Sequence, residues 1–144
     1  MNFGEDLSLQ VMLVNKAYHQ FLLKFFKDID VYQHLQIIVL INRLGGKCTQ
    51  KELCVQLYIE KSYMVKIIDT LEQKDYIIKV VNYKDRRSNL ISLTPKALEI
   101  IETFNNHMEN FTDTMGKHLT WQERHDCVRT LKLVTENFKE LNVE

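Results

Sequence analysis

The chain has 144 residues, with 19 Lys and Arg against 19 Asp and Glu, and only four Gly and one Pro. This length suits a single domain with a real core, and so few Gly and Pro favour helices over a turn-rich β fold. The longest aliphatic run, residues 37–41, is far too short to cross a membrane, and the first residues lack the basic segment of a signal peptide. We therefore expect no membrane partner and a cytoplasmic location.

The zero net charge conceals an uneven distribution along the chain. Residues 49–96 hold nine Lys and Arg against six Asp and Glu, whereas residues 97–144 hold five against nine. A basic middle segment favours an anionic partner for that segment, although the solvated surfaces of ordinary proteins show a similar bias.

The N-terminal residues predict two helices. Between residues 6 and 27, apolar side chains recur at steps of three and four, which is the period of one helix face. These side chains are Leu7, Val11, Val14, Tyr18, Phe21 and Phe25. Asp30 can serve as the N-cap of a second helix that runs to about Leu44, and Gly45 and Gly46 predict its end.

Residues 49–73 predict two short helices joined by a tight turn. Thr49 and Glu52 have the spacing of a capping box, which begins the first of these helices. The apolar side chains of the second helix fall on one face, at Met64, Ile67, Ile68 and Leu71. The opposite face carries Lys61, Ser62, Tyr63, Val65, Lys66 and Thr70. Two helices arranged in this way form a helix-turn-helix.

A β-hairpin is predicted directly after this motif. Residues 77–81 and 90–93 are rich in β-branched side chains, and the seven residues between them are polar and turn-forming. That loop carries the charged run Lys84-Asp85-Arg86-Arg87. A helix-turn-helix followed by a hairpin is a winged helix, so the expected fold class is mainly α with a small two- or three-stranded β wing.

Two further long helices complete the predicted fold. Thr94 and Pro95 supply an N-cap and a first residue for one helix, and Thr120 with Glu123 forms a second capping box. The long helices at both ends of the chain are too apolar to be left uncovered in a monomer. We therefore expect a homodimer built from the terminal helices.

The segment Asp85 to Thr94, with the sequence DRRSNLISLT, resembles the wing signature of the MarR family of bacterial transcriptional regulators. Residues 62–72 resemble the recognition helix of that family, and residues 51–57 the helix before it. The resemblance implies one MarR-like domain over residues 1–144. It places a DNA-binding winged helix-turn-helix at residues 30–95 and a helical dimerisation part at residues 1–29 and 96–144.

Three positions depart from the family pattern, since Tyr58, Asp75 and Ala97 stand where Gly is common. Asp tolerates left-handed backbone better than most residues, whereas Tyr at a positive φ would be strained. Ala97 falls inside a predicted helix, where Ala is the better helix former.

Double-stranded DNA is the partner that the resemblance implies. Ser62 and Tyr63 would bond bases or phosphates, and Val65 would touch a thymine methyl group in the major groove. Lys61 and Lys66 suit phosphates, and Thr70 lies on the same face. The alternative is that these residues form the solvated polar face of an ordinary helix.

The wing resemblance implies that Arg87 enters the minor groove, because a narrow A·T-rich minor groove attracts Arg. Asp85 would pair with Arg87 or a neighbour and hold the shape of the loop. Lys84 and Arg86 would contact phosphates. The alternative is a solvated hairpin tip whose charges only keep the protein soluble.

The expected function is a repressor that binds a pseudo-palindromic operator as a homodimer, with half-sites about 10 bp apart. Members of the family often bind small aromatic ligands, for which Tyr18, Phe21, Phe25 and Tyr32 are candidate lining residues. Core packing is the competing interpretation of those four residues. Two other functions stay open: a winged helix that docks proteins, and a ligand-binding protein without a DNA role.

No motif predicts catalysis, a cofactor or a metal site. The sequence has no Gly-rich phosphate loop, no HExxH and no nucleophile elbow, so an enzyme is not expected. Its five His form no i, i+4 pair, and its three Cys form no CxxC pair. Buried thiols are expected, with oxidant sensing by one Cys as the alternative.

Overall fold

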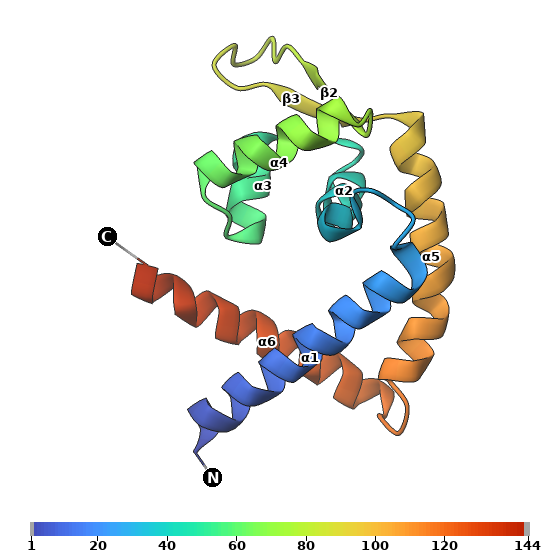
Figure 1. Cartoon of the computed structure of the whole chain (residues 1–144). Coiled ribbons are helices and arrows are strands. Elements are labelled where there is room, and N and C mark those ends of the chain that lie inside the picture. The colour runs from blue at the N-terminus through green and yellow to red at the C-terminus, as the bar shows by residue number, and fades with distance from the viewer. Residues whose placement is uncertain (1, 143–144) are drawn as a thin grey trace. The chain divides into compact units, whose positions relative to one another are not determined.

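The computed structural model describes residues 2–142 and shows six α-helices and a three-stranded antiparallel sheet over that range (Figure 1). The predicted fold class, mainly helical with a small β wing, is confirmed. Contacts divide the chain into two compact units, Met1–Phe104 and Asn105–Glu144. The predicted division at residues 29/30 and 95/96 stays a prediction. Within residues 2–142, no helix is long and apolar enough to cross a membrane.

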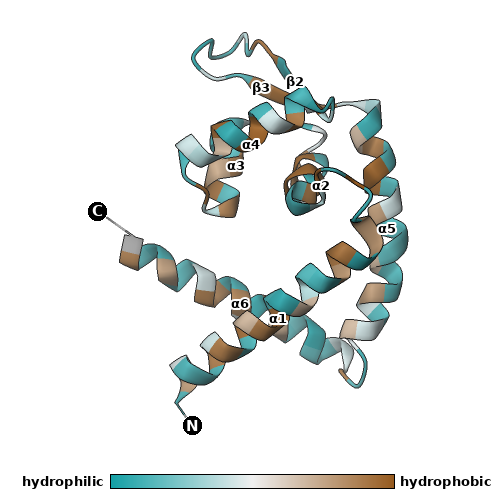
Figure 2. Ribbon diagram, in the orientation of Figure 1, coloured by the Kyte–Doolittle hydropathy of each residue, from teal (hydrophilic) through white to brown (hydrophobic). Residues whose placement is uncertain are grey.

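Helix α1, Phe3–Phe26, begins at Asn2, whose side chain accepts a hydrogen bond from the backbone N–H of Glu5. Only its C-terminal part enters the core, where Leu22 and Phe26 are buried. Much of its apolar stripe stays exposed (Figure 2), including Val11 and Val14 of the predicted set.

The second helix begins later than predicted, and the prediction that Asp30 caps it is wrong. A 3-10 turn at Tyr32–His34 intervenes, and α2 spans Leu35–Arg43 with His34 at the N-cap position. The Asp30 side chain instead accepts a hydrogen bond from the Tyr76 hydroxyl. Helix α2 fills the centre of the first unit, since five of its nine residues are buried.

Gly45 and Gly46 end α2 as predicted, at φ 94° and 82°. The N–H of Gly46 donates to the carbonyl of Ile41, and the N–H of Gly45 donates to that of Asn42. These two bonds define a Schellman motif, which satisfies the last carbonyls of the helix.

The helix-turn-helix consists of α3, Gln50–Leu57, and α4, Lys61–Gln73. The predicted capping box of Thr49 and Glu52 is present at the start of α3. Tyr58 ends α3 at φ 54°, so the turn holds a non-Gly residue in the left-handed region, which is a strained position for a bulky side chain. Met64, Ile67, Ile68 and Leu71 are all buried, as the period of the sequence predicted.

The sheet has the strand order β1-β3-β2, with β1 at Lys47–Thr49, β2 at Ile77–Val80 and β3 at Leu90–Leu93. Ile91 lies opposite Cys48 on one side and Lys79 on the other. Ile91 and Ile77 are buried, whereas the loop between β2 and β3 projects from the sheet (Figure 1). The sheet therefore anchors the wing while leaving its tip free.

Helix α5, Pro95–Met115, begins where Thr94 accepts a hydrogen bond from the N–H of Ala97, as predicted. Ala97, Ile100, Ile101 and Phe104 are buried. In the second unit, α6 spans Trp121–Lys139 and begins at the predicted capping box of Thr120 and Glu123, followed by a 3-10 turn at Glu140–Asn142. None of the residues that the structure describes in α6 is buried.

The first prediction concerns the end of α2. Replacing Gly45 by Ala should lower the free energy of unfolding by about 1–2 kcal/mol, because a Cβ is disfavoured in left-handed backbone. Urea denaturation measures this change. Gly4→Ala is the matched control, since Gly4 lies in α1 and an added Cβ would meet only the Asn2 side chain at 3.6 Å. Equal effects of the two substitutions would contradict the assigned role of Gly45.

Candidate nucleic-acid interface

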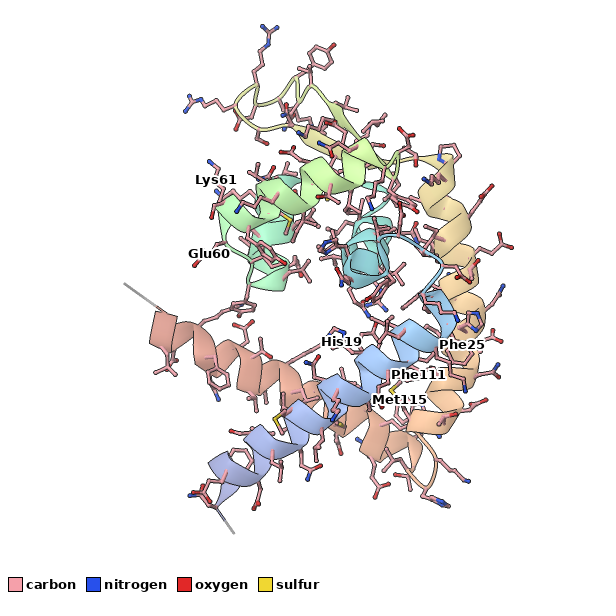
Figure 3. All side chains as sticks on the ribbon, in the orientation of Figure 1. His19, Phe25, Glu60, Lys61, Phe111 and Met115 are labelled. Carbon is pink, nitrogen blue, oxygen red and sulfur yellow. The ribbon has the colours of Figure 1, made fainter. Side chains whose placement is uncertain are left out.

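The outer face of α4 presents the predicted recognition residues to solvent. Lys61, Ser62, Tyr63, Val65 and Lys66 are exposed, because burial of the opposite face fixes the rotation of the helix. Figure 3 shows Lys61 projecting outward from the first turn. This face combines cations, hydroxyl groups and one apolar side chain, which suits a phosphate-lined groove.

Two residues at the ends of this face differ from the rest. Thr70 is half-buried, and its hydroxyl donates to the carbonyl of Lys66, 2.9 Å away. Glu60 is the N-cap of α4 and makes no capping hydrogen bond with its side chain. Glu60 is not among the residues predicted for this face, although a carboxylate immediately before a helix favours its N-terminus.

The wing loop is shaped by two consecutive turns. The N–H of Asp85 donates to the carbonyl of Asn82 at 3.2 Å, and the N–H of Ser88 donates to that of Asp85 at 3.1 Å. Both turns begin with an Asx residue whose side chain accepts a bond two residues on. The Asn82 amide oxygen accepts from the N–H of Lys84, and the Asp85 carboxylate accepts from that of Arg87, each at 3.1 Å.

Asp85 contacts Arg87 through the backbone N–H of that residue and not through its guanidinium group. Asp85 holds the backbone of Arg87, and among residues 2–142 it forms no ion pair with a guanidinium group. The side chains of Arg86 and Arg87 are exposed, as are those of Lys84 and Tyr83. Sequence reasoning missed Asn82, whose signal was an Asn at the first position of a turn.

A pair of acidic residues ties the wing to α4. The Lys79 ammonium group on β2 lies 2.8 Å from Asp69 and 3.6 Å from Glu72, both on α4. The hydrogen bond to Asp69 raises the pKa of Lys79, and the charge of Glu72 acts in the same direction. Lys79 is thus neutralised locally, whereas within the described residues Lys61, Lys66, Lys84, Arg86 and Arg87 form no ion pair.

A groove of about 480 Å³ lies beside the first turns of α4. It is lined by α1, by the start of α2, by the turn before α4 and by Tyr63 and Ile67 of α4. The polar side chains in the lining are His19, Tyr32, Gln33, His34 and Gln36, besides Tyr63. Burial lowers the pKa of His34, and Lys74 contributes in the same direction, so the imidazole favours its neutral form.

The four predicted ligand residues are not gathered in this groove. Tyr32 lines it, and the Tyr18 hydroxyl accepts a hydrogen bond from the lining residue Gln36. Phe21 and Phe25 pack against each other, with ring centroids 5.2 Å apart. Their role in ligand binding stays a prediction.

The cysteines differ widely in exposure. Cys48 is buried, Cys54 is half-buried and Cys127 is exposed. Burial raises the pKa of Cys48 to about 11, and the charge of Glu52 adds to the shift. Across residues 2–142, no group of three or more His, Cys, Asp or Glu could hold a metal ion.

The fold and the arrangement of this surface define a winged helix-turn-helix protein. Residues 32–88 match the model of the MarR family, so the winged helix-turn-helix of this chain is similar to that of the MarR family. The predicted resemblance is confirmed.

Individual proteins are also similar to this chain. The chain is 21% identical over 132 residues to the HTH-type transcriptional regulator BilQ of Clostridioides difficile (strain CD3), covering 92% of this chain and 89% of that protein. The crystal structure of a mutant MarR from E. coli, complexed with operator DNA, matches with a TM-score of 0.77 at 22% identity, covering 93% of this chain and 98% of that one. BpsR of Bordetella bronchiseptica matches with a TM-score of 0.76 at 18% identity, covering 94% and 96%.

The second prediction concerns the wing. Asp85→Ala should increase the mobility of residues 84–88 on the picosecond-to-nanosecond timescale, because the N–H of Arg87 loses its acceptor. Asp85→Asn retains an acceptor oxygen and should keep the loop ordered. Backbone ¹⁵N relaxation measures the difference. Equal order parameters in the wild type and the Ala variant would show that the Asx turn does not shape the loop.

The third prediction concerns the thiols. At pH 8 the Cys48 thiol stays protonated and buried, so iodoacetamide should modify Cys127 while leaving Cys48 intact. Mass spectrometry of peptides after a timed reaction measures both sites. In guanidinium chloride both should react, which controls for peptide detection. Modification of native Cys48 as fast as Cys127 would refute its protected state.

Proposed function

We propose that this protein is a sequence-specific, double-stranded DNA-binding transcriptional regulator that acts in the cytoplasm as a repressor. The observation that carries the proposal is the joint exposure of two surfaces in one compact unit. One is the polar outer face of α4, and the other is the basic wing loop. The match to the MarR family and the likeness to MarR bound to operator DNA support this assignment.

In this proposal α4 enters the major groove. Ser62, Tyr63 and Val65 lie in the first turns of the helix, which is the end that reaches base edges in helix-turn-helix complexes. Lys61 and Lys66 contact the flanking phosphates and set the register of the helix, and Thr70 lies further along the same face.

The wing contacts the minor groove and its phosphates. Arg87 enters the groove, while Lys84 and Arg86 contact the backbone on either side. Asn82 and Asp85 contribute through the loop, since a loop already folded into its bound shape loses less entropy on binding.

The active species in this proposal is a homodimer that reads a pseudo-palindromic operator. Large apolar side chains stay exposed on the described residues of α1 and α6, and a soluble monomer seldom leaves such surfaces uncovered. They include Leu9, Met12 and Leu13 on α1, and Val128, Leu133 and Phe138 on α6. Two-fold symmetry would then place half-sites about 10 bp apart.

A small aromatic ligand is the proposed effector, and the groove beside α4 is its proposed site. The structure of BpsR concerns the regulation of its DNA binding by 6-hydroxynicotinic acid. In this chain the groove combines apolar walls with imidazole, amide and phenol groups, a mixture typical of small-molecule sites. A ligand there would release DNA by favouring a dimer geometry in which α4 and the wing of the two subunits no longer match the half-site spacing.

The fourth prediction tests the DNA role directly. An operator is first selected from a random duplex pool with the wild-type protein. Arg87→Ala should then weaken binding to this operator by about 1–3 kcal/mol and relax the base preference beneath the wing. Fluorescence anisotropy with the selected duplex measures the affinity.

Lys132→Ala is the matched control, because it also removes one cation but lies on α6, outside the proposed interface. It should bind the operator as tightly as the wild type does. Unchanged binding by Arg87→Ala would refute the minor-groove role. Failure to select any sequence would favour a protein-docking function or a ligand-binding function instead.

A further inference from the structure

A cluster of polar side chains joins three separate stretches of the chain at the C-terminal end of α4. The Tyr76 hydroxyl donates to the Asp30 carboxylate at 2.9 Å, and the Lys74 ammonium group lies 3.3 Å from the same carboxylate. The Lys96 ammonium group lies 4.4 Å from the centroid of the Tyr76 ring. Asp30 follows α1, Tyr76 follows α4 and Lys96 lies in the first turn of α5.

The carbonyls of the turn that follows α4 are satisfied by the residues that begin α5. Lys96 donates to the carbonyl of Lys74 at 2.8 Å, and the Thr94 hydroxyl donates to the carbonyl of Asp75 at 2.6 Å. The N–H of Thr94 also donates to the carbonyl of Tyr76 at 3.1 Å. All three bonds come from Thr94 and Lys96, at the start of α5. The end of α4 is therefore fixed directly to the beginning of α5.

The contacts of Tyr76 are the best-defined part of this cluster. The side chain is buried, with 3% of its surface exposed, and burial together with Asp30 raises its pKa to about 12. The hydrogen bond from Tyr76 lowers the pKa of Asp30, against a smaller opposing effect of burial. The ion pair between Lys74 and Asp30 is partly exposed and contributes little by itself.

A Phe at position 76 would fill the same volume without needing an acceptor. A buried hydroxyl group that requires a carboxylate from a distant stretch of chain adds directionality rather than much net stability. A cation above the face of the same ring restricts the geometry from a second side. The cluster thus restrains the turn after α4 from two sides, toward Asp30 after α1 and toward Lys96 of α5.

We propose that Asp30, Tyr76 and Lys96 form a positioning latch that holds the C-terminal end of α4 against the segment after α1 and the first turn of α5, and so sets the half-site spacing that the dimer accepts. The proposal rests on the function proposed above. Helix α5 runs unbroken from Pro95 to Met115 and carries the chain into the second unit. The joint between α4 and α5 therefore connects the helix proposed to enter the major groove with the segment that leads to the proposed dimer helices.

A stiff joint and a flexible joint predict different affinities for an operator whose half-sites are too far apart. With a stiff joint, an operator with an extra central base pair can be bound at both half-sites only if the protein or the DNA is deformed. With a flexible joint, the winged helix-turn-helix of each subunit can adjust its position, so the loss of affinity for the longer operator is smaller. Asp30, Tyr76 and Lys96 lie outside the set of residues proposed to contact DNA, so the latch affects spacing preference more than contact with a single half-site.

The experiment compares the selected operator with duplexes that carry one or two extra central base pairs. The wild type should discriminate strongly against the longer duplexes. Tyr76→Phe and Lys96→Met should each reduce this discrimination by about tenfold, because each removes one directional restraint of the latch. Affinity for the selected operator itself should change much less.

Lys79→Met is the matched control, since it removes a cation and an ion pair that join α4 to β2 without reaching α5. It should retain the spacing preference of the wild type. Thermal unfolding of each variant shows whether the fold is intact.

Two results would overturn the latch. One is wild-type discrimination in both Tyr76→Phe and Lys96→Met, and the other is an equal loss of affinity for all duplexes together with a lowered melting temperature. If the wild type itself shows no sequence preference, then the proposed DNA function fails first and the latch fails with it.

Discussion

The burial of one apolar face of α4 is the constraint on which the rest of this structure depends. Met64 and Ile68 are fully buried, and their packing fixes the rotation of the helix about its axis. Once the rotation is fixed, Tyr63, Val65 and Lys66 face solvent together. A rotation by one residue would bring polar side chains into the core, at a cost that no surface interaction could offset.

The other features hold α4 and the wing in a single arrangement. Lys79 ties the wing strand to the acidic side chains of α4, and Asn82 and Asp85 fold the loop at the wing tip. At the opposite end, Tyr76 and Lys96 tie the turn after α4 to α5. The neutral chain thus gathers exposed cations on the first turns of α4 and on the wing loop, while the excess of acidic residues lies in its last third.

Local signals in the sequence were sufficient for most of the fold. The capping boxes at Thr49 and Thr120, the paired glycines after α2 and the buried face of α4 each act through contacts within a few residues. Features that depend on distant partners were not predictable. The local sequence predicts that Asp30 caps a helix, but its hydrogen-bond partner is Tyr76, 46 residues away. Strand β1 has three residues and runs into the cap of α3, so it has no period of its own.

The residues of the candidate site were predictable from the sequence, but their contacts were not. The exposed cations of the wing and of α4 follow from the pattern of polar residues, whereas the acceptor role of Asp85 toward the backbone of Arg87 depends on the turn geometry.

The central claim is that this surface binds duplex DNA through phosphate contacts, and the salt dependence of binding tests it most directly. If Lys61, Lys66, Lys84 and Arg86 of both subunits contact phosphates, the logarithm of the binding constant should fall linearly against the logarithm of salt concentration with a slope of about −7. A slope near zero at neutral pH would contradict the account.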